Sequence, residues 1–368
     1  MIIDRRRWTE DEIAAIVKEH TKPIPVRPKG FDPLKVTARE LRHYGLPPNP
    51  GVAESAAYKL WLDLVVPDSI HILSGPPGFG PGDYVLTPFL LSESAREETS
   101  DNWSGIAIAA DAGESYDVIT CRIHVPRLTA PPAPGIAPSP LAPHAPKALA
   151  VSTWLGFDGM HGTSNSMPQI GITQSYTWVP QNPPNPLPGT WTLTITAWWQ
   201  WWMRGTITSV NTVNLPVKQG DVVSCWLART SPFTALGLMT NGIYTTGPFV
   251  FAPELASNPS PDPALGRTAE WIAERPMKPT AFLPPNPAAD IWCKLYPLPQ
   301  FDWVQFTDCL VVEDAGGFVF PRALRPWRSL RMIEAFATPV SKSVVHSRAR
   351  LDGPYSFRVG PAVGRTWP

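Results

Sequence analysis

The stretch that decides the fold reads Ala269-Glu270-Trp271-Ile272-Ala273-Glu274. Side chains alternate between the two faces of a strand, so Glu270, Ile272 and Glu274 share one face and the residues between them share the other. Large apolar groups therefore occur on both faces, which predicts a buried strand that carries carboxylates. The alternation leaves one alternative open, an edge strand with both glutamates in solvent.

A buried carboxylate has a chemical use. Trp271 and Ile272 would exclude water from the acids of this stretch. Loss of hydration disfavours the charged form of a carboxyl group and raises its pKa toward the range of a general acid or base. The stretch is therefore the first candidate for a catalytic element.

The composition favours short strands joined by rigid loops. The chain has 368 residues, of which 46 are proline and 16 are tryptophan. Proline breaks helices and central strands, while tryptophan needs a large surface to pack on. A hydrophobic content of 43% is enough for a sizeable core. One large β domain with extensions fits this length.

Charge and cysteine usage exclude several partners and cofactors. The net charge is zero with a pI near 7.1, so no overall field attracts nucleic acid or an anionic membrane. We find neither a secretory signal peptide nor an apolar run long enough for a bilayer, and leave localisation open. The four cysteines lack metal spacing, so four buried thiols are favoured over two disulfides. We expect no metal, no other cofactor and a monomer.

Residues 1–98 are predicted to form an N-terminal extension with short helices. Thr9 with Glu12, and Thr37 with Glu40, have the spacing of capping boxes, and Gly45 fits a helix end. A third helix is expected over roughly 53–64. Because this segment differs in composition from the rest, a removable or groove-covering prosegment is one hypothesis for it.

Residues 99–312 are predicted to form an antiparallel β-sandwich. Two strands at 103–110 and 117–125, separated by a turn at 111–114, predict a β-hairpin. Regularly spaced short strands with little helix between them favour a sandwich. Further strands are expected at 148–157, 169–178, 190–202, 205–215, 221–230, 236–240, 268–274 and 303–312.

Residues 313–368 are predicted to form a C-terminal extension rich in arginine and proline. Its arginines recur every three residues, as on a helical face, but two prolines interrupt any helix. We interpret this segment as a solvated extension, with an interaction surface as the alternative. The residues concerned are Arg322, Arg325, Arg328, Arg331, Pro321 and Pro326.

Six separated blocks resemble, in order, the motifs of the eqolisin family, the glutamic peptidases. The resemblance covers about residues 100–312, and the block at 269–274 is very similar to the family's AEWIVE. The other blocks are 102–105 (NWSG), 154–159 (similar to WVGIDG), 168–172 (similar to LQTGV), 197–202 (similar to AWYEWY), and 298–301 with 304–308 (similar to LPDF and VTFTD). Each motif is short, but their shared order makes a chance match improbable.

The resemblance implies two packed antiparallel sheets, as in a lectin sandwich, with an active-site groove on one sheet. It places the family's catalytic glutamine on Gln169 and its catalytic glutamate on Glu274. It implies an endopeptidase that hydrolyses unfolded proteins or peptides through a bound water, without metal or covalent intermediate. We expect the substrate to be held by Trp154, Asp158, Trp198, Gln200, Glu270 and Trp271.

The chemistry of the pair can be stated from the residues alone. A glutamate with a raised pKa can take a proton from the attacking water and return it to the leaving amine. A primary amide offers a carbonyl oxygen to the water and an N–H to the developing oxyanion.

Three positions depart from the family pattern, because Gln200, Thr173 and Thr196 stand where acids are usual. Fewer neighbouring charges predict an optimum less acidic than is usual in the family. The alternative is a catalytically impaired relative that acts as a carbohydrate- or peptide-binding β-sandwich. His161, beside two glycines, is expected to be a loop residue.

Overall fold

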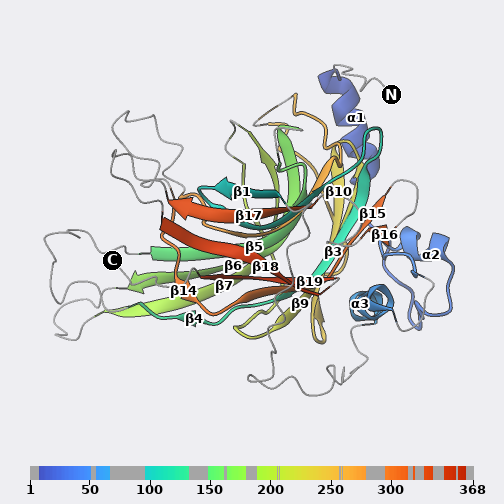
Figure 1. Cartoon of the computed structure of the whole chain (residues 1–368). Helices are drawn as coiled ribbons and strands as arrows, with labels where there is room; N and C mark the ends of the chain where they lie inside the picture. The colour runs from blue at the N-terminus through green and yellow to red at the C-terminus, as the bar shows by residue number, and fades with distance from the viewer. Residues whose placement is uncertain are drawn as a thin grey trace, which may run out of the picture.

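The computed structural model describes fifteen stretches of the chain, which we report here as the structure. They are residues 8–50, 55–66, 96–131, 148–160, 164–179, 189–204, 206, 208–256, 258, 260–278, 295–313, 318–319, 327–334, 344–353 and 355–361. Three helices lie near the N-terminus, and the rest of the described chain is almost entirely strand and loop (Figure 1).

The helices begin where the sequence predicts. Both capping boxes are present, with the Thr9 and Thr37 hydroxyls accepting from the backbone N–H of Glu12 and Glu40. Gly45 follows the second helix with a positive φ of 65°, which glycine adopts without strain. Among the described residues, no helix has the length and apolar character needed to cross a membrane. The helices are α1 (Glu10–His20), α2 (Ala38–His43) and α3 (Ala56–Val65).

The strands form two layers. In the first layer the neighbouring strands are antiparallel, except for the parallel pair at its edge, β1 and β17. In order across the layer they are β8 (Asn211–Val213), β7 (Thr190–Met203), β6 (Ser166–Val179), β5 (Ala148–Phe157), β13 (Thr268–Glu274), β2 (Trp103–Ala109), β17 (Trp327–Glu334) and β1 (Arg96–Ser100).

The second layer is also antiparallel and is joined to the first by β18 (Val344–Gly353), which pairs with both β17 and β19. Its strands in order are β12 (Phe249–Phe251), β10 (Thr234–Asn241), β9 (Val222–Ser231), β3 (Tyr116–His124), β15 (Val304–Glu313) and β19 (Ser356–Pro361). The short strands β11 (Tyr244–Thr245) and β16 (Phe318–Val319) pair with β10 and β15, while β4 (Leu128–Thr129) pairs with β14 (Gln300–Phe301). The predicted β-sandwich is thus confirmed.

Two sequence-based expectations about the strands are wrong. β2 and β3 do not pair as a hairpin, because β2 lies between β13 and β17 in one layer while β3 lies between β9 and β15 in the other. The described part of the C-terminal segment is not a solvated extension, since β17, β18 and β19 are hydrogen-bonded into the sandwich. Arg328 and Arg331 of β17 form ion pairs with Glu98 and Glu97 of β1. Their charges are thus compensated within the sandwich.

β13 is a central strand with both faces buried. It is hydrogen-bonded to β2 on one side and β5 on the other, so the edge-strand alternative does not hold. Ala269, Trp271 and Ala273 face the core between the layers, where the Trp271 indole N–H donates to the carbonyl oxygen of Thr120 in β3 at 3.0 Å. The glutamates and Ile272 therefore project from the outer face of the first layer.

Helices α2 and α3 cover the opposite side of the molecule, the outer face of the second layer (Figure 1). Leu60, Trp61 and Leu64 of α3 pack on Trp226 and Leu238 of β9 and β10. These two helices therefore do not lie over the glutamates, as a groove-covering prosegment would. Removal of this segment in solution stays a prediction.

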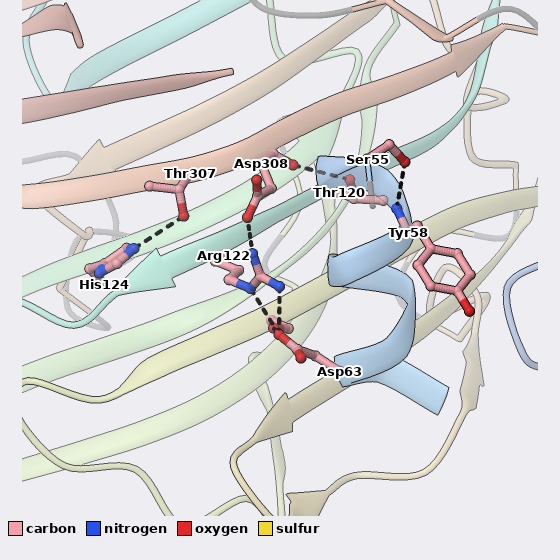
Figure 2. A network of polar contacts seen from close by, with 9 residues as sticks. Ser55, Tyr58, Asp63, Thr120, Arg122, His124, Thr307 and Asp308 are labelled. Carbon is pink, nitrogen blue, oxygen red and sulfur yellow. Dashed lines mark hydrogen bonds and ion pairs between the residues drawn. The ribbon is translucent and has the colours of Figure 1, made fainter. Parts of the chain in front are cut away.

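An ion-pair network fixes α3 to the second layer. Figure 2 shows the Arg122 guanidinium of β3 between the carboxylates of Asp63 in α3 and Asp308 in β15. The contact to Asp63 measures 2.6 Å, and the Ser224 hydroxyl lies 3.5 Å from the same oxygen. All three charged groups are largely buried, so each needs an opposite charge close by to offset the hydration that it loses.

We expect Arg122→Met to lower the free energy of unfolding by about 3 kcal/mol, because it leaves two carboxylates without a counter-charge in a largely buried place. Urea unfolding followed by tryptophan fluorescence measures this. Arg348→Met removes an exposed arginine from β18 and serves as the control. Equal effects of the two substitutions would contradict the structural role of the network.

Candidate active site

The outer face of the first layer carries an apolar cluster rich in tryptophan and methionine, here called the site face. It lies under and around the two glutamates of β13. Its members are Ala107, Trp154, Met160, Met167, Trp198, Ile272 and Leu330, with Trp103 and Trp202 partly buried at its margin.

Glu274 is half-buried at the end of β13 and is held by two side-chain donors. The Trp154 indole N–H donates to Oε2 at 2.7 Å, and the Asn102 amide donates to Oε1 at 3.0 Å. Burial raises the pKa of Glu274 to about 7, although the indoles of Trp103 and Trp154 and the Asn102 amide partly offset that rise. Glu274 can thus change its protonation state near neutral pH.

Gln169 lies on β6 and is only 3% exposed. Its Nε2 donates to Oε1 of Gln200 at 2.9 Å. The Gln200 amide in turn donates to the carbonyl and hydroxyl oxygens of Thr208, both at 3.1 Å. Gln169 Oε1 has no hydrogen-bond partner among the described residues. The Gln169 amide is therefore held through its nitrogen, while its oxygen has no partner among the described residues.

Strand register places the candidate residues in two rows across the site face. The first row runs from β13 to β7 through Glu270, Gly156, Gln169 and Gln200, and the second through Glu274, Ser152, Thr173 and Thr196. The rows are four residues apart, which corresponds to about 13 Å along the strands. Gln169 and Glu274 thus share a face but make no hydrogen bond to each other.

The second row contains hydroxyl groups where the family pattern has acids. The hydroxyls of Ser152 and Thr173 lie 2.7 Å apart, and the Trp198 indole N–H donates to Thr173 Oγ1 at 2.8 Å. Thr173 therefore belongs to a neutral network beside Glu274. It adds no charge that would repel the Glu274 carboxylate.

Two of the residues expected to contact the substrate, Trp271 and Asp158, are buried. Trp271 is fully buried on the face that points away from Glu274. Asp158 is also buried, and its carboxylate accepts from the backbone N–H groups of Leu265, Gly266 and Arg267 at 2.6 to 2.8 Å. Burial raises the pKa of Asp158 although these amides lower it, so its role is to anchor the turn before β13.

Trp154, Trp198 and Glu270 lie on the site face but are buried, so they offer little surface to a substrate in this structure. Gln200 is half-buried and touches Gln169. The sequence analysis assigned no role to Asn102, a direct partner of Glu274. Its place in the NWSG block was the available signal.

Histidine and cysteine give no second candidate centre in the described part of the chain. Cys121, Cys225 and Cys309 are buried free thiols, as expected, while Cys293 and His161 lie outside the described residues. No group of three or more His, Cys, Asp or Glu side chains in the described ranges is placed to hold a metal ion.

Among solved structures, the chain matches several glutamic peptidases. Scytalido-glutamic peptidase, solved with a transition state analog inhibitor, is 17% identical with a TM-score of 0.46, covering 72% of this chain and 99% of its own. SCP-B, an eqolisin solved with the tripeptide Ala-Ile-His, is 18% identical with a TM-score of 0.44 and the same coverage. Aspergilloglutamic peptidase from Aspergillus niger is 17% identical with a TM-score of 0.38, covering 58% of this chain and 99% of its own.

The family assignment comes from the sequence itself. No curated protein matches the chain at a significant level. The profile of the Peptidase A4 family, the eqolisins, matches residues 101–324, which is more than half of the 368 residues and includes both rows of the site face. The chain therefore belongs to the Peptidase A4 family of peptidases.

Proposed function

We propose that this member of the family is an endopeptidase in which Glu274 activates a water molecule and Gln169 assists it. The observation that carries the proposal is the setting of Glu274, a half-buried carboxylate held by Trp154 and Asn102, with its pKa raised to about 7. Gln169 lies on the same face, beyond Trp154. An extended peptide would lie across the gap between the two rows.

In the first step, ionised Glu274 takes a proton from water while the water oxygen bonds to the scissile carbonyl carbon. In the second step, Glu274 returns that proton to the amide nitrogen as the C–N bond breaks. One group can perform both steps because a pKa of about 7 makes it an adequate base and an adequate acid near neutral pH.

Gln169 is suited to support the oxyanion. One of its N–H groups is committed to Gln200, and the amide has a second N–H for the carbonyl oxygen that becomes negative. Its amide orientation is imposed from Thr208 through Gln200, so the donor is in place before the substrate arrives. Such preorganisation is the main source of oxyanion stabilisation.

A second candidate function is peptide binding without catalysis. Two observations favour it: Gln169 is 3% exposed, and the two rows are four residues apart. A substrate reaches Gln169 only if part of the surrounding apolar cover moves. An intact groove with an unassembled pair would bind a peptide and leave it uncut.

We expect Glu274→Gln to lower kcat/KM by about 10³-fold, because it removes the proton acceptor and keeps the shape. Gln169→Ala should cost about 10²-fold through the lost oxyanion donor. Cleavage of an unfolded protein substrate, followed by mass spectrometry, measures both. The controls are Glu19→Gln on the exposed side of α1 and Gln305→Ala on β15.

Retention of near-normal cleavage in both site variants would contradict the proposed pair. Binding of a peptide by the unmodified chain without cleavage at any pH would support the second candidate instead.

The raised pKa of Glu274 sets the pH dependence. Since the active base is the carboxylate, kcat/KM should rise with pH along a limb with an apparent pKa near 7. Initial rates from pH 3 to pH 9 on one substrate test this. A rate that is highest near pH 3 and falls toward neutrality would show that Glu274 is not the base.

A further inference from the structure

The first row of the site face contains polar atoms that have no partner. Both carboxyl oxygens of Glu270 and Oε1 of Gln169 are buried and make no hydrogen bond of full geometry among the described residues, although the Thr268 hydroxyl and the N–H groups of Gly159 and Met160 lie near the Glu270 carboxyl. Glu270 is 0% exposed. A buried polar atom without a partner destabilises the folded state, so three such atoms in one row indicate an interaction that the described contacts do not include.

Gly156 separates the two side chains. It lies directly opposite Glu270 on one side and Gln169 on the other, so their α-carbons are about 10 Å apart across β5. A Cβ at Gly156 would lie 2.9 Å from the Pro168 carbonyl oxygen and 3.0 Å from Gln169 Cβ. The edge of the Trp154 indole lies over the same point, with Cζ3 3.3 Å from that Cβ position, so only glycine fits between Glu270 and Gln169.

The hydrogen bonds that Gln200 makes with Thr208 and with Gln169 fix which atom of the Gln169 amide points away from Gln200. The Thr208 carbonyl can only accept, so it takes the Gln200 amide N–H, and Gln200 presents Oε1 to Gln169. Gln169 must then turn Nε2 toward Gln200, which leaves its Oε1 for Glu270. The Glu270 carboxyl and Gln169 Oε1 stand at neighbouring positions of the row, and a hydrogen bond can join them only if Glu270 carries a proton.

We propose that Glu270 is a positioning residue whose protonated carboxyl donates to Gln169 Oε1 across Gly156. The polar track then runs from Thr208 through Gln200 and Gln169 to Glu270, with one donor for each acceptor. It holds the Gln169 amide at a fixed angle to the substrate. Its effect on the rate rests on the proposed function of Gln169.

The surroundings of Glu270 favour the neutral form. Burial, and then the nearby Asp158 charge, raise its pKa to about 8, while the Thr268 hydroxyl and the N–H groups of Gly159 and Met160 lower it. Glu274 shares its face of β13. The cation on the same face is Arg328 of β17, two strands away beyond Ala107, and its guanidinium is paired with Glu98.

The sign of the pH effect follows from this pKa. Below pH 8 Glu270 holds its proton and supplies the donor, and above it the carboxylate can only accept. The track then loses its last hydrogen bond, and Gln169 is free to turn. We therefore expect a descending limb of kcat near pH 8, in addition to the rising limb of Glu274.

The test compares Glu270→Gln with Glu270→Met from pH 5 to pH 10. Met removes the donor and should lower kcat at least 10-fold at pH 6, while Gln carries a non-ionising N–H and should restore most of that loss. Glu270→Gln should also lack the descending limb near pH 8. Equal loss in both variants, or an unchanged limb in Glu270→Gln, would overturn the proposal. Should Glu270→Met not fold, the limb in Glu270→Gln decides alone.

A double-mutant cycle separates this proposal from the proposed function, because it needs no activity. Unfolding of the full chain in urea at pH 6 should show coupling of Glu270→Met with Gln169→Met of at least 5-fold in the unfolding equilibrium constant. Glu270→Met should not couple to Gln174→Met, a buried glutamine of β6 that donates to the Pro126 carbonyl instead. Coupling in a chain without peptidase activity would refute the function and keep the track, and absent coupling would refute the track.

Discussion

The pairing of β13 with both β2 and β5 is the constraint on which the rest of the structure depends. It makes this strand central, so its two faces must both be covered, one by the core between the layers and one by the site face. Two glutamates on a covered face lose hydration whatever their partners. Their raised pKa values are therefore a consequence of the position of the strand.

The loss of hydration has a different consequence for each of the two glutamates of β13. Glu274 retains partial exposure and two neutral donors, which leaves an ionisable group that can exchange protons near neutral pH. Glu270 is fully enclosed and stands across Gly156 from Gln169, an arrangement that suits an acid that stays neutral below about pH 8. Trp154 lies between the two rows and donates its indole N–H to Glu274. It therefore positions the Glu274 carboxylate as well as filling the apolar cluster of the site face.

Much of this could be predicted from the sequence, and the exceptions have physical reasons. The alternation in 269–274 predicted a strand with carboxylates on one face, and the resemblance identified Gln169 and Glu274 as the residues to examine. Alternation put Trp271 on the face opposite Glu274 but does not say which face meets the second layer, so a substrate contact was expected of a side chain that lies in the core. The turn at 111–114 indicated a change of direction but not that the chain crosses between layers. Arg328 and Arg331 were interpreted as solvated because their acidic partners in β1 are more than 200 residues away.

The most direct measurement of the central claim is a pH titration of the glutamate carboxyl carbons by NMR, with ¹³C label in glutamate only. We predict a resonance that titrates near pH 7 and is absent from Glu274→Gln. Its titration would show that the fold itself creates the base, before any substrate binds. If no resonance lost in that variant titrates above pH 5, Glu274 is an ordinary carboxylate, and the account of the site is wrong.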